Sequence, residues 1–162
     1  MVSPIPPPTG AGLTRRTALP LPPYRYVPGC NCHPFRHPDG HSYTDGRAPE
    51  HGDIDAQTLW LRGWELFDHR YYWEAHEVWE AYWHRAEDDR TCELLQGMIQ
   101  LSAAFLKRHM GHQAAAARLM EQGLGRFVLN SSVFHGMDMT ASIEAIRVAF
   151  ASGTWPLLVE KG

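Results

Sequence analysis

A short stretch of the chain, residues 72–84, concentrates residue types that bind metals and move protons. It reads YWEAHEVWEAYWH and combines histidines and glutamates with large aromatic rings. On a helix, which advances about 100° per residue, His76, Glu80 and His84 share one stripe and Glu77 lies beside them. The pattern predicts either a metal-binding site next to an aromatic face, or an amphipathic helix that carries unusually many polar and aromatic side chains but no site.

The His76-Glu77-x-x-Glu80 spacing resembles part of a zinc-protease motif, in which ligands one turn apart bind the ion and a glutamate activates water. We therefore assign His76 and Glu80 as candidate ligands and Glu77 as the candidate general base. A catalytic zinc site needs three protein ligands and an open position. A third ligand is expected from His84, from another helix or from the N-terminal segment. Side chains predicted to orient the ligands are Glu74, Gln96 and Gln100, with plain inter-helix polar packing as the alternative for the two amides.

A second group of candidate ligands lies near the N-terminus, within residues 30–41. Thiolates and imidazoles suit zinc or copper(I), and this segment holds Cys30, Cys32, His33, His37 and His41. The single residue between the cysteines is shorter than the usual structural-zinc spacing. The segment is therefore either a metal-binding loop or a loop that only packs. A joint site is also predicted, in which His33 or His41 completes the ligand set of His76 and Glu80.

Composition limits the classes of function. The chain has 162 residues, 44% hydrophobic and 20% charged, and a formal net charge of −3. It has no basic run with interleaved aromatics, so nucleic acid is not an expected partner. No apolar stretch approaches the roughly 20 residues that span a bilayer, and no signal peptide is recognisable, so we expect a cytoplasmic protein without a membrane partner. Three cysteines do not form a disulfide framework.

The chain divides near residue 52. Eight of its twelve prolines fall within residues 1–28, and proline removes donors and fixes φ. We expect residues 1–52 to form an extended Pro/Cys/His-rich arm, disordered over residues 1–19, with turn and linker material at 45–46 and 49–53. Residues 53–162 are expected to form the domain. Its periodic apolar segments predict an all-α antiparallel bundle of about five helices, joined by short connections.

Helix boundaries follow from the capping residues. Asp53 or Asp55 is expected to cap a first helix ending near residue 69, a second runs over about 72–87, and Asp88 or Asp89 starts a third. A fourth is expected over 113–129 and a fifth after Asp138. Gly97 and Ala104 share one side of the third helix, where another backbone can approach closely.

Two of these segments resemble a known family. LFDHRYYWEAHEVWEAYW, followed by LLQGMIQLSAAF, is similar to the family catalogued as domain of unknown function 309, over about residues 55–128. The family carries an aromatic-Glu-Ala-His-Glu segment and a Leu-Gln-Gly segment, matched here by residues 72–80 and 95–100. Asp68-His69-Arg70 replaces its usual glycine turn, and His112 stands in place of an expected asparagine. The His-Pro and Gly-His-Ser parts of the arm resemble N-terminal arms of relatives.

The family is labelled a predicted metal-dependent hydrolase. The resemblance thus implies a divalent ion, with zinc favoured, and a hydrolase that uses Glu77. The alternative is a non-enzymatic bundle that binds a protein partner or forms a homo-oligomer through its aromatic face and arm. The substrate, reaction and oligomeric state do not follow from the sequence.

Overall fold

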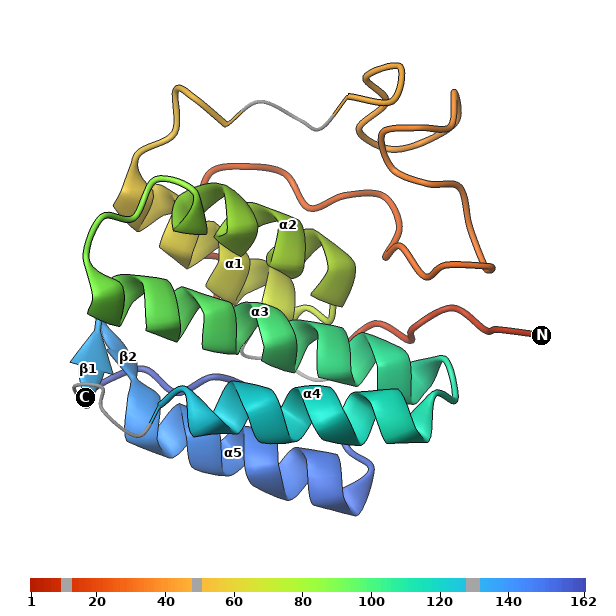
Figure 1. Cartoon of the computed structure of the whole chain (residues 1–162). Helices are drawn as coiled ribbons and strands as arrows, with labels where there is room; N and C mark the ends of the chain where they lie inside the picture. The colour runs from red at the N-terminus through yellow and green to blue at the C-terminus, as the bar shows by residue number, and fades with distance from the viewer. Residues whose placement is uncertain (10–12, 48–50, 128–131) are drawn as a thin grey trace.

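The computed structural model is an all-α bundle, as the sequence predicts, and it describes residues 1–9, 13–47, 51–127 and 132–162. The elements are α1 (Ala56–Asp68), α2 (Tyr72–Trp83), α3 (Asp89–His109), α4 (Gln113–Gly125) and α5 (Met139–Ser152), with a small hairpin of β1 (Val133–Phe134) and β2 (Met137–Asp138) before α5. Figure 1 shows α1 and α2 on one side of α3, with α4 and α5 on the other.

Three aspartates begin helices by the same local chemistry. Asp55, Asp88 and Asp138 each accept a hydrogen bond from a backbone N–H in the first turn of α1, α3 and α5. Such caps satisfy donors that the helix itself leaves without partners. The cap positions therefore agree with the sequence-based prediction. The second helix ends at Trp83 rather than near residue 87, and the fourth ends at Gly125 rather than at residue 129, which itself lies outside the described residues.

In the turn between α1 and α2, Arg70 adopts a backbone conformation that is more usual for glycine. Arg70 adopts a φ of 66°, in the left-handed region that glycine enters most easily. The N–H of Tyr71 donates to the Leu66 carbonyl at 2.8 Å, which closes the end of α1 and sets the start of α2.

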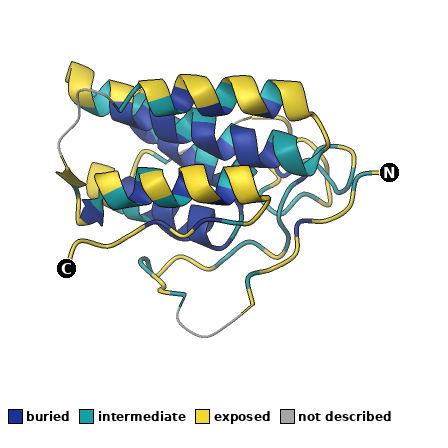
Figure 2. Ribbon diagram, turned by 90° about the horizontal axis from the view of Figure 1, so that it is seen from below, coloured by how far each residue is buried: buried dark blue, intermediate teal, exposed yellow. Residues whose placement is uncertain are grey.

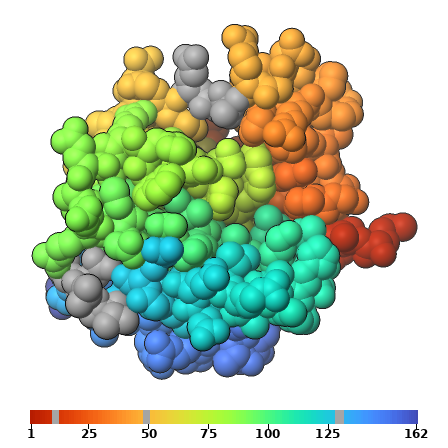
Figure 3. Space-filling model, viewed as in Figure 1, coloured from red at the N-terminus to blue at the C-terminus, as the bar shows by residue number. Residues whose placement is uncertain are grey.

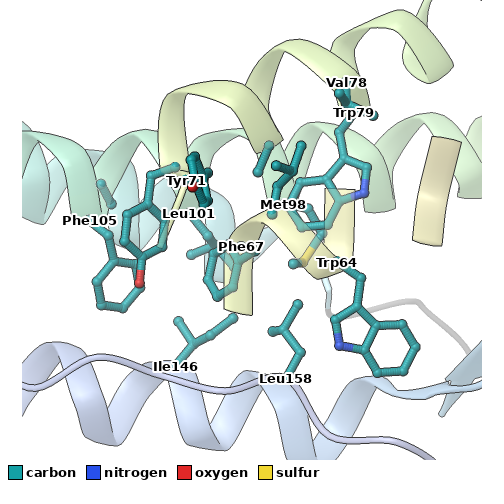
Figure 4. Close-up of a cluster of buried hydrophobic side chains, with 14 of the residues drawn as sticks. Trp64, Phe67, Tyr71, Val78, Trp79, Met98, Leu101, Phe105, Ile146 and Leu158 are labelled. Carbon is teal, nitrogen blue, oxygen red and sulfur yellow. The ribbon is translucent and has the colours of Figure 1, made fainter. Parts of the chain in front are cut away.

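The core fills the space between the helices. Figure 2 shows buried residues between the helices and exposed residues on the outer faces of α4 and α5, whereas α2 has no exposed residue. The aromatic rings of α2 supply much of the buried volume, and Figure 4 shows Trp79 near Phe67 and Met98 in this cluster. Where α3 meets α4, a Cβ on Gly97 would lie 3.2 Å from the Gly123 carbonyl oxygen and 2.6 Å from the Phe127 ring. This confirms that Gly97 permits close approach of another helix.

The arm wraps α1 and α2 instead of leaving the domain. Ile5 and Val27 are buried in the core cluster, and Arg15 and Thr17 bond to α1. The structure thus differs from the disorder expected for residues 1–19, of which 10–12 lie outside the described residues. Figure 3 shows the arm, in orange, packed against α2. The predicted linker at 49–53 is described only from residue 51. Among the described residues, no helix is both long and apolar enough to cross a membrane.

Candidate functional site

The predicted ligands on α2 form a compact cluster. The Nδ1 atom of His76 lies 3.3 Å from Glu77 Oε1 and 3.8 Å from Glu80 Oε2. One candidate ligand atom from each of the three residues lies within 4.8 Å of the others. His76 Nδ1 is shielded from solvent and has no hydrogen-bond partner among the described residues. One imidazole and two carboxylates at these distances suit a divalent ion.

His84 approaches this cluster only from its edge. Its Nε2 lies 3.9 Å from Glu80 Oε1, and its side chain is exposed. The third candidate ligand is instead Glu77, which lies within the motif itself. Glu77, predicted as the general base, has its carboxylate among the ligand atoms.

The histidines of the arm reach α2, but at other side chains. His41 Nε2 lies 2.9 Å from Glu74 Oε1, and the two side chains are 4% and 5% exposed. His33 packs its ring on Trp73 with centroids 5.4 Å apart. The joint site predicted from His33 or His41 with His76 and Glu80 is therefore not assembled, because each arm histidine has a different partner.

The predicted cysteine and histidine cluster of the arm also divides. Cys32 lies with His37 and Asp39 in a second group of candidate ligands, in which His37 and Asp39 are exposed. Cys30 packs against the core instead. All three cysteines of the chain are free thiols.

The two amides predicted to orient the ligands lie elsewhere on α3. Gln100 Oε1 accepts a hydrogen bond of 2.9 Å from Arg126, at the end of α4. Gln96 is half-buried, and within the described part of the chain it is hydrogen-bonded to neither His76 nor Glu80. The arrangement favours the alternative of inter-helix packing. Glu74 is placed on α2, where it holds the arm.

A cavity of about 390 Å³ lies between the arm and the paired helices. We call it the arm cavity. Its wall is largely apolar and contains the side chains of Phe35, Leu59, Leu66, Trp73 and Val78. Polar groups enter it at a few places, and the wall residues that carry them are His41, Ser42, His51, Arg62, Glu74 and Glu77. Glu77 therefore belongs to both the ligand cluster and the cavity wall.

The negative charge of Glu77 affects the pKa values of two nearby histidines. Burial and nearby Arg36 lower the pKa of His33, whereas Glu77 acts to raise it. The pKa of His51 is likewise lowered by burial and by Arg85, against the effect of Glu77. The carboxylate of Glu77 thus acts on imidazoles from two separate parts of the arm and linker.

Sequence reasoning missed the polar chemistry of α1. Glu65 is fully buried and accepts hydrogen bonds from Arg15, the Arg16 N–H, Thr17 and Arg62. Burial alone would raise the pKa of Glu65, but these donors lower it to about 2. The detectable signal was the i, i+3 pair of Arg62 and Glu65 within a run of apolar residues.

Asp68 is the opposite case on the same helix. Its Oδ1 accepts a hydrogen bond of 2.8 Å from the N–H of Leu158 near the C-terminus. Burial raises the pKa of Asp68 to about 7, although this N–H and the charge of Arg16 favour the ionised form. Glu65 and Asp68 thus lie three residues apart on α1 but have opposite pKa shifts. Glu65 binds the N-terminal arm, and Asp68 binds the segment near the C-terminus.

Comparison with known proteins agrees with the α2 and α3 motifs. Residues 60–119 match the family model described as Domain of unknown function (DUF309). This segment belongs to the DUF309 family. It covers α2, α3 and the greater part of α1, and it contains the ligand cluster and part of the cavity wall. No curated protein matches the chain.

Proposed function

We propose that the protein binds a divalent metal ion, with zinc favoured, at His76, Glu77 and Glu80. We further propose that it hydrolyses a small molecule held in the arm cavity. The observation that carries the proposal is the position of Glu77, which is both a member of the ligand cluster and a part of the cavity wall. An ion held there would be next to a substrate in the cavity.

The donor set fits such an ion. The shielded Nδ1 of His76 has no hydrogen-bond partner among the described residues, and buried polar atoms are normally satisfied. Three protein ligands are the number that a catalytic zinc site uses. When bound, a divalent ion supplies Lewis-acid activation of water. In this arrangement Glu77 is assigned as a ligand and not as the free general base expected from the sequence, because a carboxylate bound to the ion is not available to take a proton from water.

The alternative of an interaction module has less support from α2. Trp79, Tyr72 and Tyr82 are buried in the core, and Trp73 is packed against the arm. Most of the aromatic face is therefore occupied within the chain. The three free thiols favour a reducing compartment, and for this reason we place the protein in the cytoplasm.

Elemental analysis and zinc titration calorimetry test the metal site. Protein purified without chelator and dialysed against zinc is expected to retain a stoichiometric ion. His76→Ala and Glu80→Gln are expected to lose it while keeping the helical circular-dichroism spectrum. His112→Ala, at an exposed histidine, is the matched control, and Cys32→Ser removes the second ligand group. Stoichiometric zinc in His76→Ala, or none in the native chain, would refute the site.

Hydrolysis has its own test once zinc binding is established. The zinc-loaded protein is assayed on a panel of small carboxylic esters, amides and phosphate esters, with and without chelator. Chelator-sensitive turnover that is lost in Glu77→Gln supports the hydrolase, and absence of turnover on the whole panel counts against it.

A further inference from the structure

Glu74 has an incomplete set of hydrogen bonds in a dry environment. One of its oxygens, Oε1, accepts from the N–H of Tyr26 and pairs with His41 Nε2, both at 2.9 Å. The other oxygen, Oε2, is shielded from solvent and has no hydrogen-bond partner among the described residues. Leaving a buried acceptor without a donor is unfavourable, and more so for a charged group.

Glu74 is part of the wall of the arm cavity. The terminal torsion of a glutamate is soft. Because Oε2 has almost no exposed surface, contact with a donor in the cavity requires a rotation of the carboxylate, which would also shift Oε1 relative to Tyr26 and His41. The volume of about 390 Å³ falls within the range of small-molecule sites.

The arginines near the cavity are not available to bind an anion. Arg62 donates to Glu65 Oε1 at 2.7 Å and to the carbonyls of Leu19 and Pro20, so its guanidinium is already engaged. Arg25, whose charge also acts on Glu74, donates to the His69 carbonyl and lies over the Tyr71 ring. Besides His41, Ser42 and His51, the cavity wall therefore presents the carboxylates of Glu74 and Glu77 and a largely apolar and aromatic surface.

We propose that the arm cavity binds a small primary amine with an apolar body, its ammonium group held by the free oxygen of Glu74. A charge-assisted bond from an ammonium would satisfy Oε2 and neutralise the carboxylate. The apolar body would pack against Phe35 and Trp73, where aromatic faces also favour a cation. This ligand site does not require a metal ion, so it stands or falls separately from the hydrolase proposal.

Isothermal titration calorimetry with chelator present tests the site. The probes are phenethylamine, isoamylamine and tryptamine, with phenethyl alcohol and hydrocinnamate as neutral and anionic analogues. At least one amine is expected to bind, at least tenfold more tightly than the alcohol, and hydrocinnamate is not expected to bind. Failure of all three amines to bind at millimolar concentration would overturn the proposal, as would equal affinity for phenethylamine and the alcohol.

Isosteric variants locate the contact. Glu74→Gln is expected to weaken amine binding at least tenfold and to remove the preference over the alcohol. Glu80→Gln, on the same helix but outside the cavity wall, is the matched control and is expected to bind the amine normally while losing zinc. If Glu77→Gln abolishes amine binding and Glu74→Gln does not, the head group sits at the ligand cluster and the assignment is wrong.

A cavity-filling variant covers the case in which Glu74→Gln does not fold. Ile54, half-buried in the wall, is replaced by tryptophan to narrow the cavity while Glu74 stays in place. Ile54→Trp is expected to lose amine binding and to keep stoichiometric zinc. Unchanged amine affinity in folded Ile54→Trp would place the ligand outside the cavity.

Discussion

Replacing Asp68 with asparagine should change how stability depends on pH. The carboxyl of Asp68 is buried, and its pKa is raised from 3.8 to about 7 in the folded protein. A proton is then bound more tightly in the folded state than in the unfolded state. The stabilising contribution is fully present below about pH 4 and is lost as the pH rises through about 7.

The size of the effect follows from the interval between the two pKa values. Each unit corresponds to about 1.4 kcal/mol, so a shift of about three units corresponds to on the order of 4 kcal/mol. The amide in Asp68→Asn would keep an oxygen that accepts the Leu158 N–H, and it has no proton to lose in this range. Relative to the wild type, Asp68→Asn should therefore gain this amount between about pH 4 and pH 8.

Urea unfolding followed by circular dichroism at several pH values measures the difference between the two proteins. The histidines titrate in both chains, so their contribution largely cancels in that difference. Asp55→Asn is the control, because the pKa of Asp55 is lowered by its bonds to Thr58 and asparagine caps helices equally well. A difference between wild type and Asp68→Asn that stays constant from pH 4 to pH 8 would refute the reasoning.

Two further changes test the packing and the anchor of the arm. In Gly63→Ala the new Cβ would lie 2.1 Å from Trp79 Nε1, so we expect the free energy of unfolding measured in urea to fall by about 1–3 kcal/mol or more. Gly125→Ala is the control, because its Cβ would have nothing within 4 Å and should not lower the free energy of unfolding. A small effect at Gly63 would mean that Trp79 repacks easily. Glu65→Gln should cost about 3 kcal/mol at neutral pH and speed proteolysis of residues 13–27, because it leaves Arg62 without its buried partner. The wild type should lose that stability as the pH falls from about 4.5 toward 2, and unchanged proteolysis would show that Glu65 does not hold the arm.

The fold was predictable where it depends on local chemistry. The caps at Asp55, Asp88 and Asp138 and the apolar periodicity are properties of neighbouring residues, and they gave the helices correctly in type and order. The end of α2 was not predictable in the same way. Arg85, just beyond it, donates to the carbonyls of His51 and Ile54, which lie more than thirty positions earlier in the chain.

The same distinction applies to the candidate site. Helical geometry alone brings His76, Glu77 and Glu80 together, so their spacing was sufficient to predict the cluster. The bond between His41 and Glu74 joins residues 33 positions apart. Nothing in the local pattern distinguishes His41 from His33 as the partner of Glu74. The arm cavity depends on this long-range contact and was therefore not foreseen.

The two carboxylates of α1 also bear on the order in which the protein can fold. Glu65 binds a segment made before it, with Thr17 lying 48 positions earlier, and Asp68 binds Leu158, made 90 positions later. Contacts this distant in sequence form slowly because closing a long loop costs entropy. During synthesis, the arm can be fastened as soon as α1 exists, but Asp68 must wait for almost the whole of the remaining bundle. We therefore expect the segment around Leu158 to join the core late in folding, and the end of α1 around Asp68 to be open to solvent until then.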